Sequence, residues 1–66
     1  MNHPIDNFTD RLHRKGWSVG DAAFDDGDQR RWLVYCHRDG LVVRGVGPTQ
    51  TDAWRDACEK VASLEN

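Results

Sequence analysis

Hydrophobic residues near the N-terminus recur at the spacing of a helix. In the stretch HPIDNFTDRLHRKG, Ile5, Phe8 and Leu12 are three and four residues apart, which places them on one side of a helix. Pro4 lies near the start of this pattern and Gly16 just past its end, in the order typical of a helix start and a helix stop. The pattern predicts a short amphipathic helix.

Three segments in the middle of the chain have the composition of β-strands, and the first is the weakest. They are WSVGDAAF (17–24), RWLVYCH (31–37) and LVVRGV (41–46). Gly20 in the first segment indicates a bulge, and DDGD at 25–28 predicts the turn that follows it. Asp39-Gly40 between two apolar runs is a strong hairpin signal and predicts a type I′ turn.

The C-terminal part of the chain predicts a second helix over residues 50–64. Small and apolar residues line one side of it, namely Ala53, Trp54, Ala57, Cys58, Val61, Ala62 and Leu64. Thr49 is a natural N-cap, and Asp52 three residues later is close to a capping box. The element order is then α-β-β-β-α. One antiparallel sheet buries the apolar sides of both helices if both pack on the same face, so we expect a single two-layer α+β domain over residues 1–66.

The composition fits one small folded domain with a small hydrophobic core. A chain of 66 residues buries only about 60% of the surface that its unfolded form exposes. The large aromatic residues Trp17, Trp32 and Trp54 therefore matter for the core. The first residues, MNHPIDNF, contain no apolar run, so we expect no signal peptide, no transmembrane helix and a cytoplasmic location.

Two cysteines, Cys36 and Cys58, are too few and too far apart for a metal motif. In a reducing compartment we expect them as free thiols packed in the core, since free cysteine is among the most buried residue types. A disulfide between them is the alternative for an exported protein.

The end of the chain, GVGPTQTDAWRDACEKVASL, together with the element order, resembles the double-stranded-RNA-binding domain. Members of that family often end in a Gly-x-Gly-x-Ser-Lys-Lys-x-Ala-Lys-x-x-Ala-Ala pattern. The residues in register with its glycine, serine and alanine positions are Gly45, Gly47, Thr49, Ala53, Ala57 and Cys58. Further similarities lie in the first helix and the second strand, at Pro4, Leu12, Gly16, Trp32, Val34 and Cys36. The resemblance implies the fold, with glycines for the turn and small residues where helix meets sheet.

The residues that contact RNA in that family are the ones that differ here. Gln50, Thr51 and Trp54 stand where the family has phosphate-binding lysines at the start of the second helix. The loop that carries an RNA-contacting histidine in the family is FDDGDQRR here, with three aspartates. Lost cations and added carboxylates both weaken phosphate binding, and the net charge of −2 points the same way. We therefore expect that binding of duplex RNA in the family's usual manner is lost.

A cluster of cations on the first helix keeps nucleic-acid binding open as the second interpretation. Its candidate contacts are Arg11, Arg14 and Lys15, joined by Arg30 and Arg31 on the strands. Arg38 and Arg44 also lie on strands and would strengthen a basic patch if all of these residues converged. The simpler interpretation is a solvated helix end whose cations suit the helix dipole.

The second face of the sheet suggests binding of a protein. With a two-residue turn at Asp39-Gly40, His37 pairs with Val42, Tyr35 with Arg44 and Leu33 with Val46. This face then carries Leu33, Tyr35, His37, Val42, Arg44 and Val46. So much exposed apolar surface suggests a protein partner or a homodimer contact, and an ordinary solvated sheet with a few scattered apolar residues is the alternative. Stacking of single-stranded bases on Tyr35 would depend on one aromatic ring.

Catalytic patterns are weak. Cys36 and His37 are neighbours on a strand and point to opposite faces, so they do not form a catalytic pair. The aspartates at 25, 26 and 28 lack the later glutamate of a calcium loop. We expect no enzyme activity, no cofactor and no metal. The sequence favours a non-catalytic module that binds protein through the open sheet face, with weak RNA binding as the alternative.

Overall fold

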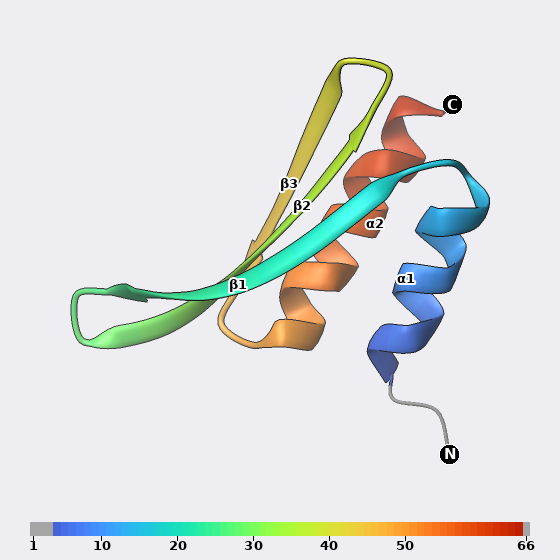
Figure 1. The fold of residues 1–66 in the computed structure, drawn as a ribbon. Helices are drawn as coiled ribbons and strands as arrows, with labels where there is room; N and C mark the ends of the chain where they lie inside the picture. Colours follow the sequence, from blue (N-terminus) through green and yellow to red (C-terminus); the bar gives the residue numbers. More distant parts are fainter. Residues whose placement is uncertain (1–3, 66) are drawn as a thin grey trace.

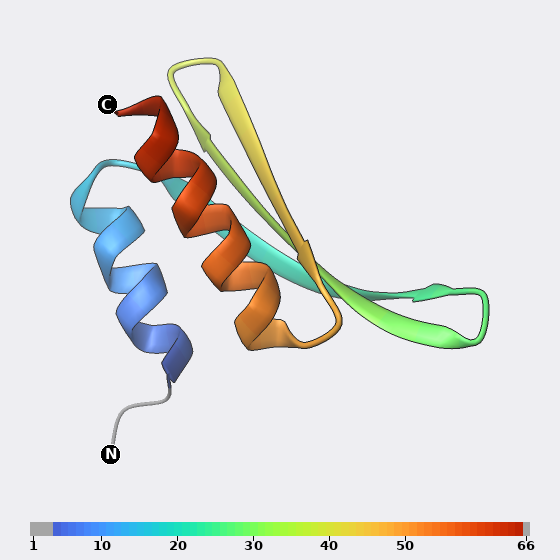
Figure 2. The same ribbon diagram turned by 180° about the vertical axis from the view of Figure 1, so that it is seen from behind.

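The chain folds as two helices and three strands in the expected order. The computed structural model describes residues 4–65; residues 1–3 and 66 of the predicted domain lie outside the described part. The elements are α1 (Pro4–Arg14), β1 (Ser18–Asp26), β2 (Gln29–Arg38), β3 (Leu41–Gly47) and α2 (Gln50–Leu64). The strands form one antiparallel sheet in the order β1-β2-β3, and both helices lie on one of its faces (Figure 1 and, from behind, Figure 2). The predicted α+β class and α-β-β-β-α architecture are confirmed.

Both hairpins close with two-residue turns. Asp39 and Gly40 have φ values of 52° and 82°, and positive φ at both central residues is what a type I′ turn requires. In the first hairpin the strands continue to Asp26 and Gln29, which form a cross-strand pair, so the four-residue turn predicted at 25–28 was too long. Only Gly27 and Asp28 remain between the strands, with glycine at the position of positive φ (64°) that a type II′ turn needs.

The predicted bulge at Gly20 was wrong. The pairing of β1 with β2 continues without an extra residue from Ser18 opposite His37 to Asp26 opposite Gln29. Gly20 lies opposite Tyr35, and a Cβ added to it would be 2.7 Å from the Tyr35 hydroxyl oxygen. The glycine therefore leaves space for an aromatic ring that lies across its strand.

The far end of the first hairpin extends away from the helices (Figures 1 and 2). Every residue from Asp21 to Arg30 is exposed, and Arg31 is half-buried. We call residues 21–31 the arm. Beyond Asp21, whose side chain is bonded to α2, the two strands of the arm extend past both helices.

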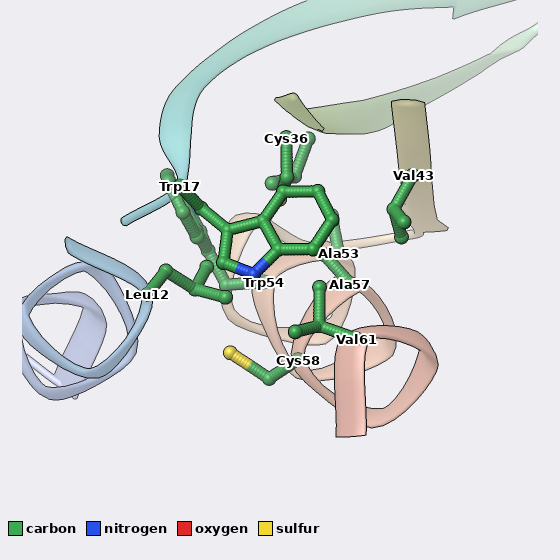
Figure 3. Packing of buried hydrophobic residues seen from close by; sticks show 10 residues of the cluster. Leu12, Trp17, Cys36, Val43, Ala53, Trp54, Ala57, Cys58 and Val61 are labelled. Atoms are coloured by element: carbon green, nitrogen blue, oxygen red, sulfur yellow. The ribbon is translucent and has the colours of Figure 1, made fainter. Parts of the chain in front are cut away.

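The core lies between the sheet and the two helices (Figure 3). Its buried residues are Leu12, Trp17, Val34, Cys36, Val43, Ala53, Trp54, Ala57, Cys58 and Val61. Both cysteines are free and buried in this cluster, which confirms their interpretation as core residues. Two residues predicted for the inner side of α2, Ala62 and Leu64, are instead exposed, because the last turn of the helix lies past the region that the core covers.

The end of α1 directs Trp17 into this core. Gly16 has a φ of 87°, and its N–H donates to the His13 carbonyl at 3.0 Å. The next N–H, that of Trp17, donates to the Leu12 carbonyl at 3.0 Å. This pair of bonds is a Schellman motif, which typically brings the residue after the glycine against the helix. Trp17 and Leu12 are accordingly both buried in the core.

The backbones of α2 and β3 are in close contact. A Cβ added to Gly45 would lie 2.5 Å from the Ala57 nitrogen, and one added to Gly47 would lie 2.8 Å from the Ala53 nitrogen. Both glycines are inside β3 and neither has a positive φ. They therefore allow the helix to approach the sheet, and the turn role implied by the resemblance was wrong.

The start of α2 is capped as predicted. The Thr49 hydroxyl oxygen accepts a hydrogen bond from the Asp52 N–H at 3.2 Å. In place of the reciprocal bond of a capping box, the Thr49 hydroxyl donates to the Asp52 carboxylate at 2.9 Å.

Candidate functional site

The face of the sheet that the helices leave uncovered carries all six residues predicted for protein binding. The pairs His37 with Val42, Tyr35 with Arg44 and Leu33 with Val46 occur as predicted. Since cross-strand partners point to the same side, these six side chains share one face. Tyr35 is 45% exposed and Val42 is 61% exposed.

Strand β1 adds apolar residues to this face that the sequence analysis missed. Phe24, which is 39% exposed, lies opposite Arg31, and Ala22 lies opposite Leu33. The signal that could have found them is Gly27-Asp28, because a two-residue turn there fixes this register. We use the term open face for the set Ala22, Phe24, Leu33, Tyr35, His37, Val42, Arg44 and Val46.

The open face combines apolar surface with a cation that has no partner in the described part of the chain. No hydrogen bond or ion pair is found there for the Arg44 guanidinium; Arg44 is the cross-strand neighbour of Tyr35, whose ring lies over Gly20 on β1. Arg31 at the edge of this face is 3.0 Å from the Asp26 carboxylate and is thereby neutralised. The arrangement suits a partner that brings apolar side chains and a carboxylate.

The cations of α1 lie at its C-terminal end and are partly neutralised. The Arg14 guanidinium is 3.1 Å from the Asp10 carboxylate, and the Lys15 ammonium is 3.3 Å from the Glu65 carboxylate. Arg11 joins these residues and Asn7 around a shallow hollow of about 370 Å³. Surface ion pairs of this kind contribute little to stability but lower the local positive charge.

The remaining candidate cations do not converge with those of α1. Arg30 is 3.6 Å from Asp25 within the arm. The arm and the C-terminal end of α1 lie at opposite ends of the molecule in both views (Figures 1 and 2). Only Arg38 lies near the α1 cluster, where it donates a hydrogen bond of 2.6 Å to the Lys15 carbonyl and stacks 4.6 Å above the Trp17 ring. Two separate groups of cations result.

Two of the residues that the resemblance places at lysine positions bind a carboxylate of the protein itself. The Gln50 amide donates to the Asp21 carboxylate at 2.7 Å, and the Trp54 indole N–H donates to the same oxygen at 3.1 Å. Asp21 belongs to β1 at the base of the arm, so these bonds attach the arm to the start of α2. Both donors are therefore occupied within the molecule.

The groups that resemble catalytic residues are separated. Cys36 is fully buried and His37 is exposed on the other face. Burial raises the pKa of the Cys36 thiol to about 11, with Cys58 nearby adding to the effect. The pKa of Cys58 is also raised by burial. Among residues 4–65, no three His, Cys, Asp or Glu side chains are grouped as metal ligands.

Comparison with known proteins assigns no relative to this chain. No protein-family model matches it, and none of the curated proteins is similar to it in sequence. Within the described residues, neither helix has the length and apolar character needed to cross a membrane.

Proposed function

We propose that this protein is a non-catalytic module that binds another protein through its open face. The observation that carries the proposal is the exposed apolar surface that continues across all three strands, with Phe24 on β1, Tyr35 on β2 and Val42 on β3. Contiguous apolar surface on a small folded chain is typical of an interaction site, because exposing it to water is unfavourable.

The charge of the open face favours a foreign protein over a second copy. Arg44 lacks an acidic partner in the described chain, so each copy of the protein would carry this cation on its open face. Two copies placed face to face would bring these like charges together without a free carboxylate on the face. A partner with an acidic residue beside its apolar contact surface fits better.

We also propose that the fold is a version of the double-stranded-RNA-binding domain in which the RNA-binding end has another use. Supporting this are the close contact of Gly45 and Gly47 with α2 and the topology of the chain. Gln50 and Trp54 stand where cations would be needed, and both are bonded to Asp21.

The runner-up is weak binding of RNA through Arg11, Arg14 and Lys15 of α1, with Arg38 close by. Their ion pairs with Asp10 and Glu65 reduce what they offer a phosphate. Arg30 and Arg31 lie in the distant arm and do not add to this group. Few phosphate contacts imply low affinity and a shallow dependence on salt.

The proposal is tested with one pair of matched variants. Val42→Asp places a carboxylate on the open face, and Leu41→Asp makes the same change at the preceding position of β3, whose side chain points to the other face of the sheet and is 49% exposed against 61%. Proteins captured from a lysate by the wild type are purified and their affinity is remeasured with each variant. We expect Val42→Asp and Tyr35→Ala to weaken the purified complex at least tenfold, and Leu41→Asp to leave it within twofold.

Two further measurements separate the alternatives. Sedimentation velocity of the free protein over a wide concentration range tests for a dimer, and a dimer broken by Val42→Asp would replace the foreign partner with a second copy. Fluorescence anisotropy with duplex and single-stranded RNA at two salt concentrations tests the runner-up. Micromolar affinity that falls steeply with salt and is lost in Arg11→Ala/Arg14→Ala would overturn the protein-binding proposal.

A further inference from the structure

The two edges of the sheet differ in how their backbone groups are satisfied. On β3, the Val46 N–H donates to the Asp56 carboxylate at 3.0 Å, and the Lys60 ammonium donates to the Arg44 carbonyl at 2.8 Å. Both partners are side chains of α2, which lies along this edge. An edge strand with bonded backbone groups is a poor template for another strand.

The pairing register shows which backbone groups of β1 face outward. Since residues 44 and 46 direct their backbone groups to the outer edge of β3, the even-numbered residues of β2 bond to β3 and the odd-numbered ones bond to β1. Through the register of β1 with β2, the outward groups of β1 within the arm are those of Asp21, Ala23 and Asp25. No hydrogen bond to these groups is found in the described part of the chain, and all three residues are exposed.

We propose that the free edge of β1 in the arm binds an extended peptide of alternating basic and apolar residues, which adds to the sheet as a fourth strand. Main-chain hydrogen bonds to residues 21, 23 and 25 supply the attachment, and the side chains of β1 select the peptide. This site shares Ala22 and Phe24 with the open face, but it is attached through the backbone of β1 and does not rest on the proposed binding of a folded partner.

The side chains of β1 specify the alternation. On the helix side of the sheet an added strand has neighbours Asp21, Ala23 and Asp25. Asp21 accepts hydrogen bonds from the neutral donors Gln50 and Trp54 and keeps its charge, and Asp25 is in an exposed pair 3.6 Å from Arg30. The two carboxylates therefore call for basic residues at the two ends of a five-residue core. On the open side its neighbours are Ala22 and Phe24, which call for apolar residues between them. The pattern basic-apolar-x-apolar-basic reads the same in both directions, so it fits either strand orientation.

The charge of the arm favours a basic peptide over a second copy of β1. The arm contains four aspartates (21, 25, 26 and 28) and two arginines (30 and 31), which gives it a net charge of −2. Two β1 strands joined edge to edge would place Asp21 and Asp25 of both copies on one face of the joined sheet. Like charges gathered in this way are destabilising, whereas lysines on the added strand are attracted.

The test is a titration of the isotopically labelled protein with three capped peptides, followed by amide NMR. The first peptide is Thr-Val-Lys-Val-Thr-Val-Lys-Val-Thr. The second carries glutamate in place of both lysines, and the third has the same composition as the first with its lysines on adjacent residues. We expect the first peptide to bind at least tenfold more tightly than the other two. Its addition should shift the amides of Asp21, Ala23 and Asp25 more than those of Ala22 and Phe24, whose N–H groups face β2.

Two variants at one position test the backbone pairing. Ala23→Pro removes an outward N–H without removing a bond to β2, and proline is tolerated at such edge positions. Ala23→Thr keeps the N–H. We expect Ala23→Pro to bind the first peptide at least tenfold more weakly than Ala23→Thr, with both variants folded by circular dichroism.

Three results would overturn the edge proposal: equal affinity for the peptides with alternating and adjacent lysines, equal binding by the two variants, or shifts confined to the open-face residues of β2 and β3. The last result would still leave the open-face proposal standing. Conversely, the peptide titration could give the results expected for the edge while Val42→Asp leaves the affinity of the purified complex unchanged. The open-face proposal would then be refuted and the edge proposal would stand. If Ala23→Pro does not fold, the test is the wild-type titration: larger amide shifts at residues 21, 23 and 25 than at 22 and 24 support the edge proposal, and the absence of this difference overturns it.

Discussion

Replacing a glycine by alanine has opposite predicted outcomes at two positions of this sheet. Gly45 on β3 faces α2, and Gly20 on β1 faces solvent beneath the Tyr35 ring. Neither has a positive φ, so backbone strain does not distinguish them. The difference between Gly45→Ala and Gly20→Ala therefore isolates what the new methyl group meets.

The structure allows the size of this difference to be estimated. At Gly45 the methyl carbon would lie 2.5 Å from the Ala57 nitrogen and 2.7 Å from the Ala57 Cβ, so α2 must move away from the sheet. Overpacking of this kind costs about 1–3 kcal/mol, and the upper end applies because backbone atoms do not rotate aside. At Gly20 the methyl carbon meets the end of the Tyr35 side chain, which is half exposed and free to move. Loss of glycine flexibility in the unfolded chain stabilises the fold by about 0.4–1 kcal/mol and offsets that movement.

The assay is urea and thermal unfolding followed by fluorescence of the buried tryptophans Trp17 and Trp54. We expect Gly45→Ala to lose about 3 kcal/mol of a total near 5 kcal/mol, and Gly20→Ala to stay within about 0.5 kcal/mol of the wild type. For a domain of this size, 3 kcal/mol corresponds to a fall in Tm of roughly 12–24 °C.

Equal stability of the two variants would refute the reasoning, because it would mean that α2 does not touch the backbone of β3 at Gly45. A large loss in Gly20→Ala would refute the other half, since it would show that the Tyr35 ring is fixed in place. Gly27→Ala provides a reference for backbone strain alone, because its φ is 64° and a methyl group there has open space around it.

Two predictions concern the ionisation of buried and bonded groups. The thiols of Cys36 and Cys58 should resist Ellman's reagent in the folded protein and react on unfolding. The pKa of Cys36 rises from 9.0 to about 11 on folding, so the unfolded chain loses its thiol proton first. The free energy of unfolding should therefore fall as the pH increases across that range. Rapid reaction of the native protein at pH 8 would contradict the core position of both thiols. The Val46 N–H lowers the pKa of Asp56 below 3.8, so Asp56→Asn should cost about 1 kcal/mol near neutral pH, and this difference should shrink as the pH falls below 3.8. Urea unfolding at pH 7 and pH 2.5 measures it, and a difference that does not change with pH would contradict the role of the carboxylate.

Most of the fold follows from local patterns in the sequence. The helix signals at Pro4, Gly16 and Thr49 and the turn signal at Asp39-Gly40 correspond to the observed caps and turn. Each of these signals depends on the backbone conformation of a few neighbouring residues, and contacts with distant segments do not change that conformation here. The register of β2 with β3 followed from one of these turns, and with it six residues of the open face.

What the sequence did not reveal depends on contacts between distant segments. Phe24 was missed because four polar turn residues obscured the two-residue turn at Gly27-Asp28. The pairing of Arg30 and Arg31 with aspartates of the same hairpin requires that register, and without it they counted as free cations. Leu64 has the right helical spacing, but whether a sheet covers the last turn of a helix is decided by the lengths of both elements.

The hydrogen bonds of Asp21 connect the start of α2 to the position of the arm. Side chains without a donor at positions 50 and 54 would leave the Asp21 carboxylate free to face solvent, whereas Gln50 and Trp54 hold it against α2. Because Asp21 is also the first residue of the arm whose backbone faces outward, these two hydrogen bonds fix the position from which the free edge of β1 begins. Gln50 and Trp54 therefore place the strand edge for which we propose a peptide partner. The attached arm and the fixed start of its outer edge both follow from these two side chains at the start of α2.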